Sequence, residues 1–195
     1  MSKIVYIIPG FTEKTSSKSY QRIIKSFKSH NFHVIPIKIS WKHKVMSDYV
    51  KEFLEQLSYG KNDQIYIFGF SFGAMIAFIS ATQLKPKMLF LCSLSPYFKE
   101  DLKYVKKSWI NIVGKKRIDD LKNFSFNQLV KKINCKTFLI IGEKESKEIQ
   151  NRINDANIKM KNSKLFIVKN TKHDISQKAY TDKLKEIINL KLLMF

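Results

Sequence analysis

Hydrophobic residues along the chain form two patterns that alternate: short apolar runs, and longer stretches in which apolar residues recur with helical spacing. Between most of the short apolar runs, apolar residues recur at i, i+3, i+4 and i+7, the spacing of amphipathic helices; one such helix carries Tyr20, Ile23, Ile24 and Phe27. Continuous apolar runs are typical of strands covered on both faces of a parallel sheet. The alternation therefore predicts an α/β fold with a doubly wound, six-stranded parallel sheet. The expected strands lie at residues 4–8, 33–39, 65–68, 88–92, 137–141 and 164–168.

The second apolar run contains Pro36. Proline has no backbone N–H and cannot donate to a neighbouring strand, so it is confined to edge strands, strand ends and bulges. We therefore expect the strand at 33–39 to form one edge of the sheet.

The alternation of strands and helices is interrupted between residues 93 and 134. A first helical pattern ends near Gly114, and a second begins at the capping box Ser125-Phe126-Asn127-Gln128. An interval of about 40 residues is smaller than an ordinary domain. We expect a single domain over residues 1–195, with a cap-like helical insertion at about 96–134. The apolar positions of the first helical pattern are Leu102, Val105, Trp109 and Ile112.

The sequence Gly69-Phe70-Ser71-Phe72-Gly73 lies between the apolar run at 65–68 and an apolar helical stretch. A G-x-S-x-G sequence between a strand and a helix is typical of a nucleophile elbow, a tight turn that lifts the serine hydroxyl clear of the sheet. Glycine at both ends leaves room for the neighbouring strand and helix. The start of the helix presents N–H groups and a positive dipole end to an anion at the hydroxyl. Ser71 is therefore the candidate nucleophile.

Acidic and histidine residues follow two later strands. His173 comes after the sixth apolar run, and Glu143 and Glu145 come after the fifth. In a parallel α/β sheet the site lies beyond the carboxyl ends of the strands, so these residues share one edge with Ser71. A serine needs an imidazole to take its proton, and the imidazole needs a carboxylate to orient it. The order predicts a catalytic triad, although spacing alone does not choose between the two glutamates.

These features resemble the α/β-hydrolase superfamily over essentially the whole chain. The resemblance implies the strand order 2-1-3-4-5-6, with the Pro36 strand at an edge and a small cap at 96–134. It also implies that the acid is the third residue after Gly142, which is Glu145. Two positions depart from the usual family pattern: Pro9 stands where histidine is common, and the acid is glutamate where aspartate is commoner. The pieces that match are residues 4–11, 69–73 and 140–145, with His173.

The resemblance further implies an oxyanion hole made by the backbone N–H groups of Phe11 and Phe72. Residues 96–134 hold ten Lys or Arg and four Asp or Glu, an excess of positive charge that favours an anionic substrate. Aromatic side chains near the serine and in the insertion are candidates for an apolar substrate pocket. These are Phe70, Tyr97, Phe98 and Trp109, together with Phe11 and Phe72.

The formal net charge of +20 raises the question of nucleic-acid binding. Only three of the 36 basic residues are arginine, the residue that nucleic-acid readers favour for bidentate contacts, so we interpret the charge as a lysine-rich surface and expect no nucleic-acid partner. No apolar run reaches the roughly 18 residues of a membrane span, and the N-terminus lacks a signal-peptide pattern, so we expect a cytoplasmic protein. No cofactor or metal is expected, because metal-ligand spacings and nucleotide-binding glycine motifs are missing.

The sequence thus predicts a serine hydrolase that cleaves a carboxylic ester or thioester through an acyl-enzyme, with acyl transfer as a related outcome. Ser71 attacks, His173 acts as general base and then acid, and Glu145 orients the imidazole. Two other classes stay open: a non-enzymatic α/β-hydrolase-fold binding protein and a basic nucleic-acid-binding protein. Fluorophosphonate labelling separates the enzyme from the binding protein, and the salt dependence of DNA or RNA retention tests the last class.

Overall fold

The computed structural model describes residues 2–105, 111 and 113–192. At its centre is a six-stranded sheet in the order β2-β1-β3-β4-β5-β6, in which each neighbouring pair is parallel. This confirms the predicted sheet and its strand order, including the edge position of the strand that ends at Pro36. The strands are β1 (Lys3–Ile8), β2 (Phe32–Pro36), β3 (Gln64–Phe70), β4 (Met88–Cys92), β5 (Lys136–Gly142) and β6 (Ser163–Val168).

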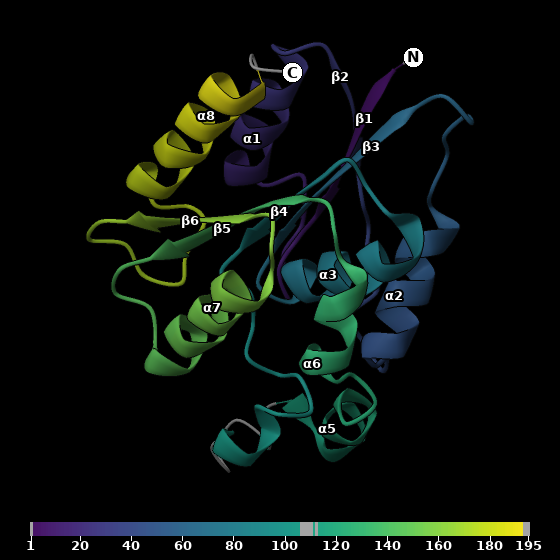
Figure 1. The fold of residues 1–195 in the computed structure, drawn as a ribbon, viewed down its shortest axis with the longest axis vertical. Helices are drawn as coiled ribbons and strands as arrows, with labels where there is room; N and C mark the ends of the chain where they lie inside the picture. The colour runs from purple at the N-terminus through teal and green to yellow at the C-terminus, as the bar shows by residue number, and fades with distance from the viewer. Residues whose placement is uncertain (1, 106–110, 112, 193–195) are drawn as a thin grey trace.

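Helices cover both faces of the sheet (Figure 1). The buried side chains form two separate cores, one on each face. Helices α1 (Lys18–Lys28) and α8 (Lys178–Leu192) pack on one face. Helices α2 (Met46–Glu55), α3 (Phe72–Leu84) and α7 (Lys147–Lys159) pack on the other. In the part of the chain that the structure describes, no helix is both long and apolar enough to cross a membrane.

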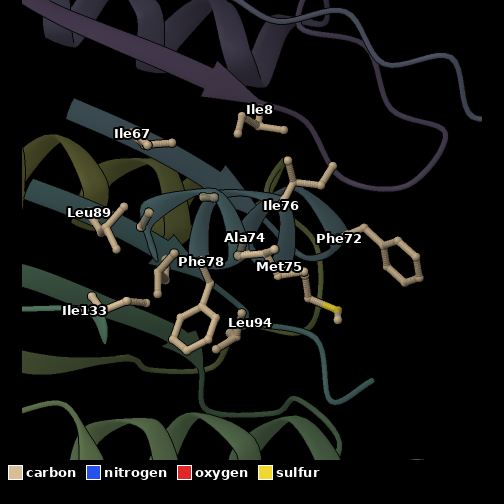
Figure 2. Close-up of a cluster of buried hydrophobic side chains, with 14 of the residues drawn as sticks. Ile8, Ile67, Phe72, Ala74, Met75, Ile76, Phe78, Leu89, Leu94 and Ile133 are labelled. Atoms are coloured by element: carbon tan, nitrogen blue, oxygen red, sulfur yellow. The ribbon is translucent and has the colours of Figure 1, made fainter. Parts of the chain in front are cut away.

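Helix α3 is the most deeply buried helix, as its apolar sequence predicts. Every residue from Phe72 to Ala81 is buried, because the helix lies between the sheet and the elements around it. Figure 2 shows its side chains among residues of β1, β3 and β4, with Ile133 and Leu94 on the side of the insertion. A helix packed on all sides has little freedom to shift, so it holds the turn at its N-terminus in place.

The segment between β4 and β5 contains η1 (Leu102–Tyr104), α5 (Lys115–Leu121), α6 (Phe126–Leu129) and η2 (Val130–Lys132). The helix that begins at the capping box is confirmed, since the Ser125 hydroxyl accepts a hydrogen bond from Gln128 N. The pattern from Leu102 begins with the short η1, and Trp109 and Ile112 lie outside the described residues.

Helix α5 was not expected from the sequence, because its seven residues show no clear helical periodicity. Two polar anchors hold it against the body of the protein. The Arg117 guanidinium donates to the carbonyl oxygens of Lys44 at 2.9 Å and Trp41 at 2.8 Å. The Asp120 carboxylate accepts from both the backbone N–H and the hydroxyl of Ser47 at the start of α2. Contacts distant in sequence therefore decide where this helix forms.

A buried ion pair joins α7 to the segment after β4. Arg152 is 5% exposed and binds both carboxylate oxygens of Asp101, with Nε at 3.0 Å from Oδ2. Its Nη1 lies 2.9 Å from Asp155 Oδ2, and its guanidinium stacks 4.0 Å from the ring centroid of Phe126 in α6. Because Arg152 is held by two carboxylates and a ring, it fixes α7 relative to the segment beside it.

Candidate active site

Ser71 occupies a strained turn between β3 and α3. Its φ of 56° and ψ of −118° lie outside the regions that residues other than glycine usually adopt. A Cβ at Gly69 would lie closer than 3.0 Å to backbone atoms of Gly73 and Ala74. A Cβ at Gly73 would lie equally close to the carbonyl oxygens of Ile8 and Pro9. Both glycines are therefore needed for backbone segments to approach at this turn.

Replacing Gly73 with alanine is expected to lower the free energy of unfolding by about 2 kcal/mol. Alanine gains about 1 kcal/mol over glycine from helix propensity. Overlap with two backbone oxygens costs about 3 kcal/mol, the upper end of the usual range for overpacking, because main-chain atoms cannot move aside as a flexible side chain can. Urea unfolding measures the change. Gly60→Ala is the control: its Cβ would meet only the Asp63 carboxyl, at 3.3 Å, so we expect an effect under about 0.5 kcal/mol. Equal stability of both variants would contradict the prediction.

His173 contacts the serine and an acid through its two ring nitrogens. Its Nε2 lies 2.9 Å from Ser71 Oγ, and its Nδ1 lies 2.7 Å from Glu145 Oε2. The imidazole ring packs on Phe70, with ring centroids 5.1 Å apart. This contact helps to hold the orientation of the imidazole. The structure thus brings together three residues that are 28 to 102 positions apart in the sequence.

The two glutamates after β5 occupy different environments. The Glu145 side chain is fully buried, and its Oε1 accepts hydrogen bonds from Ser93 Oγ at 2.6 Å and Gly142 N at 2.8 Å. Glu143 is exposed, and its carboxylate accepts from Asn170 N at 2.8 Å, away from the imidazole. Glu145 is therefore the residue that meets His173, at the position that the resemblance implies.

Backbone hydrogen bonds tie the loop after β5 to the loop after β6. Glu143 N donates to Val168 O at 2.9 Å, and Lys144 N donates to Thr171 O at 2.8 Å. Gly142 permits this approach, because a Cβ there would lie closer than 3.0 Å to the Thr171 oxygen atoms. The loop of the acid and the loop of His173 are therefore one connected unit.

Phe11 and Phe72, the expected donors of the oxyanion hole, lie next to one another. Phe72 is the first residue of α3, and Phe11 follows β1, with their ring centroids 5.2 Å apart. The loop after β1 is held by the Glu13 carboxylate, which accepts from Gly10 N at 3.0 Å and from the Tyr20 hydroxyl at 2.5 Å. Both backbone segments therefore lie at the carboxyl edge of the sheet, where Ser71 lies.

A cavity of about 900 Å³ adjoins Ser71 and His173. Phe11, Phe72 and Tyr97 form one wall of it. Burial raises the pKa of the Tyr97 hydroxyl, aided by the charge of Glu148, so this aromatic wall is uncharged at neutral pH.

Two of the aromatic residues expected in the pocket lie elsewhere. Phe98 is fully buried against Phe78 and Phe126, where it fills the core under the insertion. Phe70 is 2% exposed and packs behind the imidazole rather than facing the cavity, because its side chain points to the opposite face of the sheet from Phe72. Trp109 lies outside the described residues.

Another part of the cavity lining comes from α7, and most of its side chains there are polar. The charged groups on the described lining are three carboxylates and two cations, so this part of the lining carries no excess of positive charge. Lys106 and Lys107 of the segment at 96–134 lie outside the described residues, so the expected preference for an anionic substrate stays a prediction. The charged residues are Asp101, Glu148, Asp155, Lys147 and Arg152.

Three further hydroxyl groups at this site were not singled out from the sequence. Ser95 Oγ lies 3.1 Å from Ser71 Oγ, and Ser93 Oγ contacts Glu145. The Tyr180 hydroxyl lies 2.8 Å from Ser93 Oγ. Both serines directly follow β4, so the rule that sites form at the carboxyl ends of parallel strands applies to them as well.

Solved structures with a similar fold are known from several organisms. Est1E from Butyrivibrio proteoclasticus matches with a TM-score of 0.82 at 14% identity, covering 100% of this chain and 89% of that one. Alpha/beta hydrolase domain-containing protein 10 from mouse gives 0.74 at 14% identity, over 95% and 88% of the two chains. The Pyrococcus furiosus esterase Pf2001 gives 0.72 at 17% identity, over 99% and 82%.

No protein-family model and no curated protein matches the sequence. The structural similarity nevertheless extends over at least 95% of this chain, which includes the parallel sheet on which the site is built, and over 82–89% of the compared chains. The chain therefore adopts the fold of the α/β-hydrolase superfamily.

Proposed function

We propose that the protein is a serine hydrolase that cleaves a carboxylic ester or thioester through an acyl-enzyme. The observation that carries the proposal is the unbroken line of contacts from Ser71 Oγ through His173 to the buried carboxylate of Glu145. The similar structures support it: the Pyrococcus furiosus protein is named an esterase, and Est1E has a structure with ferulic acid, a carboxylic acid, bound.

In the proposed acylation step, Ser71 Oγ attacks the substrate carbonyl carbon while His173 Nε2 takes the hydroxyl proton. The carbonyl oxygen becomes an oxyanion, for which the backbone N–H groups of Phe11 and Phe72 are the proposed donors. The carbon–oxygen or carbon–sulfur bond then breaks, and the imidazolium gives its proton to the leaving group. Glu145 keeps Nδ1 protonated and stabilises the imidazolium.

Deacylation repeats these steps with water as the nucleophile. His173 takes a proton from the water, whose oxygen attacks the acyl carbon. When the tetrahedral intermediate collapses, the proton returns to Ser71 and the carboxylic acid leaves. An alcohol or amine in place of water turns the same intermediate to acyl transfer, so the balance of the two outcomes depends on which acceptor reaches the acyl-enzyme.

The cavity supports a neutral substrate with one apolar part. The aromatic wall next to Ser71 fits an apolar group, and the polar face of α7 fits a part that carries hydroxyl or amide groups. The carboxylates of Asp101 and Asp155 are already paired with Arg152, so the guanidinium is not available as a counter-ion for an anionic group.

Fluorophosphonate labelling tests the proposal without knowledge of the substrate. A fluorophosphonate reacts with an activated serine, so the expected result is a single adduct on the peptide that carries Ser71, identified by mass spectrometry. Hydrolysis of p-nitrophenyl esters of increasing acyl length, compared with an anionic succinate monoester, then tests the preference for a neutral substrate. An unlabelled Ser71 in folded protein would overturn the proposal and leave the binding-protein alternative.

A further inference from the structure

The segment after β4 contacts both ends of the proposed triad through two alternate serines. Ser93 Oγ donates to Glu145 Oε1 at 2.6 Å, and Ser95 Oγ lies 3.1 Å from Ser71 Oγ. Ser93 is fully buried and Ser95 is 2% exposed. Neither hydroxyl is needed for the chemistry of a serine, histidine and acid, so their placement calls for a separate explanation.

The hydrogen-bond directions at this site are fixed by the acid. The Glu145 carboxylate only accepts, so His173 Nδ1 must carry a proton and Nε2 of the neutral ring must accept one from Ser71. The proton of Ser71 is then engaged, and the contact between the two serine oxygens requires Ser95 to donate to Ser71 Oγ. The hydrogen bonds therefore all point the same way: Ser95 donates to Ser71, Ser71 donates to His173, and His173 donates to Glu145.

The same reasoning applies at the acid end. The only proton of the Ser93 hydroxyl goes to Glu145 Oε1, so the contact of 2.8 Å with the Tyr180 hydroxyl requires Tyr180 to donate to Ser93. The Ile140 carbonyl oxygen, at 3.2 Å, is a second and more distant acceptor for the same proton. Burial raises the pKa of Tyr180 well above its ordinary value, which keeps this hydroxyl protonated and able to donate. Hydrogen bonds arranged in one direction polarise and strengthen one another. Donors thus converge on Glu145 from both sides.

Ser93 also has a strained backbone. Its φ is 50°, in the left-handed region, and its N–H donates to Ile140 O at 2.7 Å. A residue other than glycine in this region is strained and persists only where its surroundings hold it. This conformation turns the chain after β4 so that the hydroxyl of Ser93 meets Glu145, while that of Ser95 meets the nucleophile.

We propose that Ser93 and Ser95 are positioning residues of the hydrolytic site, with Ser93 orienting the acid through Glu145 and Ser95 orienting the hydroxyl of Ser71. The inference rests on the proposed function. Ser93 matters more, because a hydrogen bond to a charged group contributes more than one between two neutral hydroxyls.

The test compares Ser93→Ala, Ser93→Gly and Ser95→Ala with the wild type, using fluorophosphonate labelling rates and the kinetics of a p-nitrophenyl ester. The glycine variant removes the hydroxyl and relieves the backbone strain, so it keeps the test valid if Ser93→Ala folds poorly. The matched control is Ser80→Ala: Ser80 is also fully buried, but its hydroxyl has no hydrogen-bond partner within the described residues.

Both Ser93 variants are expected to lose about tenfold in kcat with little change in KM, and Ser95→Ala about threefold. The downfield NMR resonance of the imidazole proton shared with Glu145 should broaden or move upfield in both Ser93 variants. Ser80→Ala should match the wild type in kcat and in this resonance. A purely structural role would lower the melting temperature without moving the resonance or the labelling rate of the folded fraction.

The two proposals fail in different ways. A wild type that fluorophosphonate does not label would overturn the proposed function and this inference with it. A labelled wild type whose Ser93→Gly variant keeps full kcat and an unchanged resonance would overturn the inference alone.

Discussion

Ser71→Ala is expected to lower kcat for ester hydrolysis by about 10⁴-fold or more. The alanine has no oxygen to form the acyl-enzyme, and His173 loses the hydroxyl that lies 2.9 Å from its Nε2. Donors to an oxyanion and the substrate cavity remain in this variant, so the residual rate is that of a bound ester attacked by water. Steady-state kinetics with the best ester of the chain-length series measures the loss.

The fold of Ser71→Ala should be intact. The Ser71 side chain faces the cavity, whereas the two flanking glycines, which the turn requires, are unchanged. Alanine keeps the same strained φ of 56°, so thermal unfolding should shift by no more than a few degrees. Near-normal turnover in a folded, unlabelled Ser71→Ala protein would falsify the covalent mechanism.

The sheet could be predicted from the sequence because its signals are local and strong. The central strands are continuous apolar runs. In β2, where the exposed His33 interrupts the apolar residues, Pro36 marks an edge strand, because a missing N–H matters wherever a strand is paired on both sides. The helical segments are less regular. Helix α5 escaped prediction because Arg117 and Asp120 hold it through partners about 70 residues away, and no periodicity reports such contacts.

Some residues of the site could likewise be predicted from the sequence, and others could not. Ser71 and His173 could be located because each follows a strand at the edge where sites form, and the glycines around the serine mark a sharp turn. Ser93 and Ser95 follow a strand at the same edge, but serine is common in loops. Only the left-handed φ of Ser93, which no local pattern specifies, turns its hydroxyl toward Glu145.

The sequence also does not determine which aromatic side chains line the cavity. Residues i and i+2 of a strand face the same side of the sheet, but β3 ends at Phe70 and α3 begins at Phe72. The turn at Ser71, with its φ of 56°, therefore sends the two side chains into different cores even though they flank the same serine. Phe98 follows Tyr97 directly, yet one lines the cavity and the other fills the core. Which aromatic side chain reaches a pocket depends on backbone direction at single residues, and composition carries no such information.

Glu145→Gln is expected to lower kcat by about 10⁴-fold while the fold survives. The Oε1 position accepts from Ser93 Oγ and from Gly142 N, and a backbone N–H cannot reverse its role. The amide oxygen of a glutamine is therefore drawn to that position, which turns the amide NH₂ toward His173 Nδ1. The imidazole then has to accept at Nδ1 and carry its proton on Nε2, the tautomer that cannot take a proton from Ser71.

Glu143→Gln is the matched control, because it makes the same chemical change two residues away. The Glu143 carboxylate accepts from Asn170 N at the exposed surface, and an amide oxygen can accept the same bond, so kcat should change less than twofold. The ratio of kcat between the two variants is the measurement, with melting temperatures checking that both are folded. A loss larger in Glu143→Gln than in Glu145→Gln would move the role of the acid to Glu143. Ser71 and His173 would keep their assignments in that case, because their contact with one another does not depend on which carboxylate orients the ring.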